Sequence, residues 1–208
     1  MVIRSLVALL LLTGAALADA PSSHERWTRA ALARLPVAVP DRAPERADAK
    51  REQLDALTTA IAHESLTAPA TPRQWVAVLG AIGYRESTFS LDVHAGLCSS
   101  WQCDARKLPG GGVQFMARSS FQLHQNDHTR PVWAQLVGVE HTAVQVAAAS
   151  KMAKIGHRRC ARLGVAFPQS VFRGHSGASC SFEHPGEKAR VATFQMLLAT
   201  SMPKVEAS

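Results

Sequence analysis

The sequence predicts a mainly α-helical domain with a small loop or β-hairpin insertion, stapled by disulfides. Three observations support this fold class. Apolar residues recur at helical spacing in segments separated by proline- and glycine-containing breaks, which indicates about six helices. A glycine-rich, non-periodic stretch over residues 90–112 interrupts them. The chain also carries an even number of cysteines, 4 in all, which is typical of a disulfide framework in an exported protein.

Residues 1–20 have the pattern of an export signal. Arg4 provides the positive start, residues 6–12 the apolar middle, and small residues offer cleavage sites near Ala18 or Ala20. The apolar run is too short to cross a bilayer, and no cysteine follows it for lipid attachment. We therefore expect an exported protein, periplasmic or secreted, without a transmembrane segment.

The net charge of +7 is spread along the chain rather than gathered in one stretch. Aromatic residues make up only 6%, so the composition argues against a dedicated nucleic-acid surface. A diffuse positive field suits a polyanionic partner, such as an anionic cell-wall polymer or a membrane surface, and it also aids solubility. No cofactor motif stands out, because Gly110, Gly111 and Gly112 lack the lysine of a phosphate-binding loop.

The four cysteines are Cys98, Cys103, Cys160 and Cys180. Four cysteines allow three connectivities, and loop closure favours the two local pairs, Cys98–Cys103 and Cys160–Cys180. Zinc binding is the competing use, but the spacings are not those of a zinc knuckle or ribbon. We expect two disulfides and no metal.

Two helices are predicted before residue 71. The first covers residues 24–35, a proline-containing break follows over residues 36–44, and the second helix covers residues 45–66. We expect residues 21–70 to form a helical extension that packs on the outside of a domain over residues 71–200. Residues 201–208 form a short tail.

The central helix is predicted over residues 71–89. Thr71 can cap its start, Pro72 suits the first helical position, and Gln74 completes a capping box. Apolar residues spaced by four and three then form one stripe, which ends in a carboxyl group: Trp75, Leu79, Ile82 and Glu86. Burial and the negative end of the helix dipole both favour the protonated form of that carboxyl, which is what a general acid needs. Solvent exposure or pairing with Arg85 is the simpler alternative.

After the loop over residues 90–112, residues 113–124 begin like a strand. One bent helix or two helices are expected from Pro131 to Leu163, then an irregular stretch over residues 164–186 and a last helix over residues 187–200. The stripe expected on the first of these helical stretches consists of Trp133, Val137, Val144, Ala148, Met152 and Ile155. The inward side of the last helix is expected to carry Val191, Phe194, Leu197 and Leu198.

Three segments in order resemble the lysozyme-like superfamily, and most closely its soluble lytic transglycosylase domain. Residues 83–89 (GYRESTF) look like the helix-terminal Glu-Ser motif, and residues 119–124 (SSFQLH) are similar to the segment that ends in a glutamine beside the cleft. Residues 172–177 (FRGHSG) stand where that family carries a third cleft segment. The resemblance implies an α+β lysozyme-like fold over residues 71–200 and cleavage of peptidoglycan glycan strands, with Glu86 as general acid and base.

The same resemblance suggests residues that contact the saccharide. Gln122 would orient the substrate beside Glu86, although a glutamine that bonds loop backbone at a strand end is an equally ordinary alternative. Aromatic rings would stack on sugar faces, although core packing is the more usual role for Phe121. The expected substrate-binding residues are Gln122, Ser120, Phe121, Trp101, His175 and Ser176.

Departures from that family leave alternatives open. Ser119 stands where the second motif opens with glycine, and the third segment lacks a tyrosine and an asparagine. A non-catalytic wall-binding module is therefore one alternative, and a basic membrane-active protein is another. A lysozyme-type hydrolase would need a second carboxylate, for which the candidates are Asp92, Asp104 and Asp127. His124 and His128 have a spacing that could bind a metal, but no H-E-x-x-H motif is present.

Overall fold

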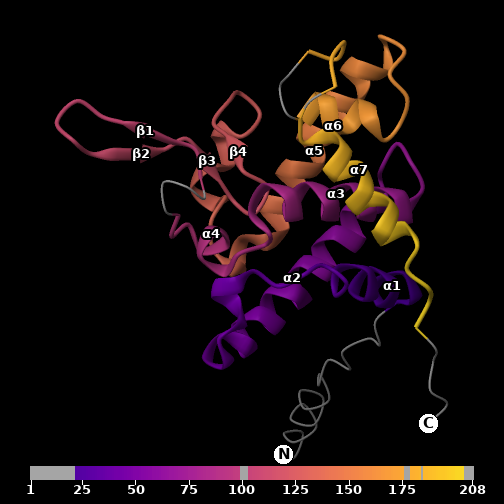
Figure 1. The fold of residues 1–208 in the computed structure, drawn as a ribbon, viewed down its shortest axis with the longest axis horizontal. Helices are drawn as coiled ribbons and strands as arrows, with labels where there is room; N and C mark the ends of the chain where they lie inside the picture. The colour runs from indigo at the N-terminus through magenta and orange to yellow at the C-terminus, as the bar shows by residue number, and fades with distance from the viewer. Residues whose placement is uncertain (1–21, 99–102, 176–178, 184, 204–208) are drawn as a thin grey trace, which may run out of the picture.

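A computed structural model describes residues 22–98, 103–175, 179–183 and 185–203. Within these residues the protein is mainly helical, with short antiparallel hairpins, as the sequence predicts. Helix α3 runs through the middle of the molecule, and the hairpin of β1 and β2 projects from one end (Figure 1). The export signal expected over residues 1–20 lies outside the described residues.

Helices α1 (Ser23–Leu32) and α2 (Ala47–Ser65) form the N-terminal part, joined by two 3₁₀ turns, η1 (Val39–Arg42) and η2 (Pro44–Arg46). Helix α1 begins with a capping box, in which Ser22 accepts from the backbone of Glu25 and the Glu25 side chain accepts from Ser22. Both helices are shorter than the sequence pattern suggested, because proline 3₁₀ turns occupy the connection.

Helix α3 (Pro72–Ser87) has the predicted start, with Thr71 as N-cap and Gln74 completing the capping box. It ends at Ser87 rather than at residue 89, because Thr88 (φ 53°) and Phe89 (φ 50°) both take left-handed backbone angles. This reversal returns the ring of Phe89 to the core, where it meets Phe121 edge to face at 5.9 Å. A Cβ built on Gly83 would come within 2.4 Å of the Phe89 ring, so glycine lets that ring lie against the helix.

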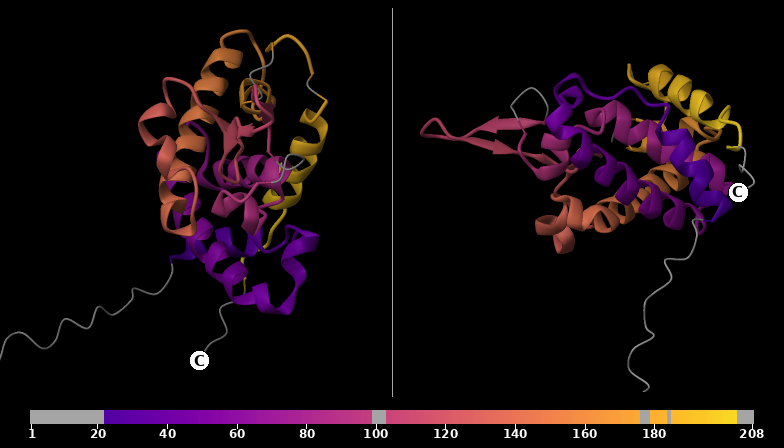
Figure 2. Two further views of the ribbon diagram at one scale, coloured as in Figure 1. Left: turned by 90° about the vertical axis from the view of Figure 1, so that its left-hand side faces the viewer. Right: turned by 90° about the horizontal axis from the view of Figure 1, so that it is seen from below.

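The hydrophobic core is continuous from the N-terminal helices to the last helix. It contains buried residues of α1 and α2 as well as those of α3, among them Trp27, Ile61 and Trp75. The indole nitrogen of Trp27 donates to the carbonyl of Thr200, 2.9 Å away, which ties α1 to the end of α7 (Glu187–Leu198). In two further views α1, α3 and α7 lie side by side (Figure 2). The helices expected as an outer extension, residues 21–70, are therefore part of the same core.

The insertion after α3 is more ordered than the loop that the sequence predicted. It contains helix α4 (Leu91–Ala95) and strand β1 (Ala105–Lys107), which pairs antiparallel with β2 (Val113–Phe115). A second hairpin follows, made of β3 (Ala117–Arg118) and β4 (Leu123–His124).

The helix expected from Pro131 begins later. Two 3₁₀ turns, η3 (Arg130–Gln135) and η4 (Val139–His141), precede α5 (Thr142–Ala161), and α6 (Gln169–His175) lies in the stretch expected to be irregular. The apolar stripe expected on α5 is wrong in register, because Val144, Met152 and Ile155 are only half-buried. The buried face instead includes Val146, Ala149, Ala153, Gly156 and Cys160.

Both expected disulfides are present, Cys98–Cys103 and Cys160–Cys180. The second one joins the end of α5 to the segment between α6 and α7. Among the described residues, no helix combines the length and the apolar character needed to cross a bilayer.

Candidate functional site

Glu86 lies in the last turn of α3 and lines an open pocket of about 490 Å³, here called the Glu86 pocket. The neighbouring residues of the α3 end, 84–88, line it together with Ser90 and Val93. Its remaining lining comes from the connection between α1 and α2, namely residues 36–40 and Arg42. The N-terminal part, for which the sequence suggested no chemistry, therefore forms part of this pocket.

Two side chains from other helices, an arginine and a histidine, lie next to the Glu86 carboxylate. Arg190 of α7 donates from Nη2 to Glu86 Oε1, and the side chain of Arg190 is 8% exposed. His175 is the last residue of α6, and its Nε2 lies 3.9 Å from the same oxygen, beyond hydrogen-bond distance. The site therefore combines the ends of α3 and α6 with the first turn of α7.

The surroundings of Glu86 differ from the dry, uncharged setting that its place on the apolar stripe suggested. Its side chain is 21% exposed and forms an ion pair with Arg190. Burial lowers the pKa of His175 and the positive charge of Arg190 lowers it further, while the Glu86 carboxylate and the carbonyl of Phe121 oppose this shift. Around neutral pH His175 therefore favours its uncharged form, and Arg190 is the cation that balances Glu86.

The positions of Arg190 and His175 are held by contacts between α6 and α7. Arg173 of α6 donates from Nε to Glu187 of α7 at 2.8 Å and from Nη1 to the carbonyl of Cys180 at 3.1 Å. The hydrogen bond that Arg173 donates to Glu187 raises the pKa of Arg173, so this link stays charged. Since Cys180 is bonded to Cys160 of α5, three helices are joined around the side chains that contact Glu86.

The turn over residues 119–122 is a structural element beside the site. The hydroxyl of Ser87 donates to the carbonyl of Ser120 at 2.8 Å, which ties the turn to the end of α3. Ser119 (φ 67°) and Gln122 (φ 48°) take left-handed angles, and Ser119 Oγ accepts from the backbone of Phe121 at 3.1 Å. Left-handed angles favour glycine, so the glycine that the resemblance would place at residue 119 suits this backbone.

Four of the expected substrate contacts do not line the Glu86 pocket: Ser120, Phe121, Gln122 and His175. Ser120 and Phe121 are fully buried, so the predictions that they bind a glycan are wrong: the hydroxyl of Ser120 bonds His94, and the ring of Phe121 packs in the core. Gln122 does not line the pocket, and its amide donates to Ser119 and to the sulfur of Cys103. His175 lies near Glu86, with its Nε2 3.9 Å from Oε1, and its expected contact with the saccharide stays a prediction. Trp101 and Ser176 lie outside the described residues.

The candidate second carboxylates form other pairs. Asp92 accepts from Arg46 at 2.7 Å, and Asp104 and Asp127 are exposed on the hairpin side, near His124 and Arg130 respectively. None of the three lines the Glu86 pocket among the described residues. That part of the chain also holds no group of three side chains placed to bind a metal ion, and His124 is paired with Asp104 instead.

Arg190 is the site residue that the sequence reasoning missed. It lies on the buried face of α7. Glu187 and Thr193, each three residues away, and Phe194, four residues away, are also buried. A cation on a buried helical face needs an anionic partner, so this spacing was the available signal. The expected inward face was right at Phe194 and Leu197, but Val191 and Leu198 are half-buried and Arg190 lies inward instead.

Comparison of the chain with protein-family models, with curated proteins and with solved structures gave no match. The functional assignment therefore depends on the contacts of Glu86, Arg190 and His175.

Proposed function

We propose that the chain is an exported enzyme that cleaves peptidoglycan between its two alternating sugars, with Glu86 as the reacting group. One observation carries this proposal: a carboxylate that lines an open pocket of about 490 Å³ is bonded by a buried arginine, with a buried histidine 3.9 Å from the same oxygen. Enzymes that cleave glycosidic bonds use carboxyl groups held in such pockets. The resemblance of residues 83–89 to the Glu-Ser motif supports the same assignment.

In the proposed reaction Glu86 acts twice. Its protonated carboxyl donates to the glycosidic oxygen as the bond to the anomeric carbon breaks and positive charge develops on the sugar. The resulting carboxylate then takes a proton from the nucleophile that attacks this carbon, which restores the starting form. The contacts from Arg190 and His175 both reach Oε1, so Oε2 is the oxygen available for proton transfer.

Arg190 is hydrogen-bonded to Glu86, whose carboxylate is the base of the second step. The first step needs the protonated form, so the guanidinium must loosen its bond to Oε1 when the glycan occupies the pocket. Arg190 is therefore a positioning residue. Its bond to Glu86 opposes the first step, in which Glu86 donates a proton, and favours the second, in which Glu86 accepts one.

Lytic transglycosylation is favoured over hydrolysis by the residues around the pocket. A retaining hydrolase uses two carboxylates about 5 Å apart, and an inverting one separates them by roughly 6.5–9.5 Å. Glu86 is the only acidic side chain among the described residues that line its pocket. Attack by the substrate's own 6-hydroxyl needs no second carboxylate, so we expect 1,6-anhydro products.

A second candidate function is a wall-binding module without turnover. The bond from Arg190 favours it, because a carboxylate held by a permanent ion pair cannot donate a proton. The same pocket would then bind the glycan without cleaving it.

Digestion of purified cell-wall sacculi separates these functions. We expect soluble fragments with 1,6-anhydro ends, read by mass spectrometry, from the wild-type protein and at least a hundredfold fewer from Glu86→Gln. Glu64→Gln is the matched control, because Glu64 has a similar exposed fraction (22%) and is also paired with a cation, Lys154. Equal release by wild type and Glu86→Gln would end the assignment. Sedimentation with sacculi and no release from either would establish the binding module instead.

A further inference from the structure

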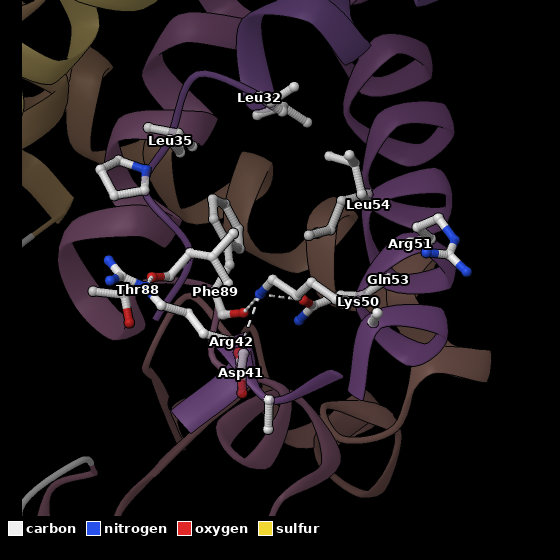
Figure 3. A pocket seen from close by; sticks show the side chains of 16 residues that line it. Leu32, Leu35, Asp41, Arg42, Lys50, Arg51, Gln53, Leu54, Thr88 and Phe89 are labelled. Atoms are coloured by element: carbon white, nitrogen blue, oxygen red, sulfur yellow. Dashed lines mark hydrogen bonds and ion pairs between the residues drawn. The ribbon is translucent and has the colours of Figure 1, made fainter. Parts of the chain in front are cut away.

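A second pocket, of about 420 Å³, lies beneath the connection between α1 and α2 (Figure 3). It is here called the apolar pocket. Side chains from the end of α1, from the first three turns of α2 and from the reversal after α3 surround it. Its apolar walls are formed by Leu32, Leu35, Leu54, Leu57 and Phe89. A hollow of this size, with apolar walls, is within the range of small-molecule sites.

One end of the apolar pocket is polar. The ammonium group of Lys50 donates to Asp41 Oδ2 at 3.2 Å, to Gln53 Oε1 at 2.8 Å and to the carbonyl of Phe89 at 2.5 Å (Figure 3). These three bonds use all the hydrogens of the ammonium group. Lys50 therefore has no donor left for a ligand.

Gln53 has the free donor. Its side chain is buried, the residue being 1% exposed, and its Nε2 has no partner among the described residues. The orientation of the amide is set by its neighbour, because Lys50 can only donate and so must face the oxygen. A buried amide N–H without an acceptor is costly, and an acceptor supplied by a ligand would remove that cost.

The two charged groups at this end, Asp41 and Lys50, are paired with each other. Asp41 accepts from Lys50 and from the backbone of Leu91 at 3.0 Å, and it lies 3.4 Å from Arg46. At the rim, Arg42 donates to the carbonyl of Val37, and Arg51 pairs with Asp48. An anionic ligand would meet the carboxylate of Asp41 and a cationic one the ammonium of Lys50, so a neutral ligand fits best.

We propose that the apolar pocket binds a free neutral amphiphile, with its aliphatic chain among the leucines and its carbonyl or hydroxyl oxygen bonded to Gln53 Nε2. The inference is independent of the function proposed for Glu86, which does not line this pocket. The ligand class follows from the apolar walls, the pairing of Asp41 with Lys50, and two buried atoms without a hydrogen-bond partner among the described residues, the donor Gln53 Nε2 and the acceptor Asp41 Oδ1.

Titration of the protein with octanamide, octanoate and octane, followed by calorimetry, tests the ligand class. We expect octanamide to bind and octanoate to bind at least tenfold more weakly. Gln53→Met replaces the amide by an apolar side chain of similar length, and we expect it to weaken octanamide binding about tenfold. Nitrogen-15 NMR adds a local readout, since the side-chain amide signals of Gln53 should shift with octanamide and stay in place with octane.

Leu54→Trp is the second variant, because a larger ring on this half-buried residue fills the pocket without removing a polar contact. We expect it to abolish octanamide binding while the melting temperature stays within a few degrees of wild type. The proposal fails if octanamide does not bind wild type, if octanoate binds as tightly, or if Leu54→Trp binds like wild type. Binding to phosphatidylcholine vesicles alone, without binding of free octanamide, would also overturn it.

Discussion

His94 shows how a single buried side chain organises the region next to the site. It is fully buried on α4, and its two ring nitrogens lie 2.9 Å from the hydroxyls of Ser120 and Thr142. It thereby joins α4 to the turn over residues 119–122 and to the start of α5. Burial lowers the pKa of His94 to about 4, and the positive charge of Lys50 acts in the same direction, while Glu140 opposes it.

The unfolding free energy should therefore decrease as the pH is lowered from 6.5 to about 4. In the unfolded chain His94 regains a pKa near 6.5, so between about pH 4 and 6.5 the unfolded state binds more protons and becomes favoured as the pH falls. The full difference corresponds to roughly 3 kcal/mol of unfolding free energy. Urea unfolding across this range measures it. His94→Gln cannot titrate, so its stability should change less between pH 6.5 and 4, and identical pH profiles would contradict the prediction.

The pair of Glu86 and Arg190 can be tested at the same scale. Arg190 Nε and Nη1 have no partner among the described residues, so loss of the Glu86 carboxylate leaves a buried guanidinium without an anion. We expect Glu86→Gln and Arg190→Met each to lower the unfolding free energy by about 2 kcal/mol. The double variant should lose less than the sum of the two. A double-mutant cycle by denaturant unfolding gives the coupling, and additive losses would show that the ion pair contributes nothing.

At the scale of elements, α5 and α6 approach each other through glycines. A Cβ built on Gly156 would lie 2.6 Å from the backbone carbon of Gly174, and one built on Gly174 would lie 2.3 Å from that of Gly156. Helices can approach this closely only where side chains are missing. This contact places His175, the residue after Gly174, against the end of α3.

Gly156→Ala should therefore separate the two helices. We expect a loss of about 1–3 kcal/mol, although alanine is the better helix former, because the added methyl group meets backbone that cannot move aside. Thermal unfolding measures the effect. Gly112→Ala in the hairpin is the control, since its Cβ would make only ordinary contact with Leu108 at 3.7 Å. A Gly156→Ala melting temperature equal to that of wild type would show that the helices can shift.

The two disulfides differ in how much chain they close. The Cys160–Cys180 bridge spans 20 residues and the Cys98–Cys103 bridge spans 5. From loop entropy, replacing both cysteines of the longer loop by serine should cost about 3 kcal/mol, and the same change in the shorter loop about 2 kcal/mol. Guanidinium unfolding of the two double-serine proteins compares them. The reverse order would show that local contacts outweigh loop length.

At the scale of the whole molecule, the N-terminal helices and the site depend on each other. Trp27 and Ile61 are fully buried in the core that α3 also enters, and residues 36–40 line the Glu86 pocket. A fragment of residues 67–208 would expose the apolar faces of α3 and α7 that α1 and α2 cover. We expect this fragment to show no cooperative thermal transition by circular dichroism. A sharp transition would mean that residues 71–200 fold without the helices before them.

Features encoded within a few residues were predictable. The capping box at Thr71 and Gln74 and the two local disulfides depend on neighbours in sequence, and all are confirmed. The end of α3 was predicted two residues late, because Thr88 and Phe89 take left-handed backbone angles although neither residue is glycine, the usual sequence signal for such angles. The face of α5 was also wrong, since alanine-rich helices give little contrast between their sides.

The sequence by itself determined the helical class, the cysteine pairs and the place of a carboxyl group at the end of a capped helix, because short-range hydrogen bonds and side-chain periodicity encode them. Only the tertiary structure decided what that carboxyl meets: Arg190 is 104 residues away in the chain. It likewise decided that Gln53 lacks an acceptor within an apolar pocket. Such contacts depend on how helices cross and which faces they bury, and no local pattern specifies that geometry.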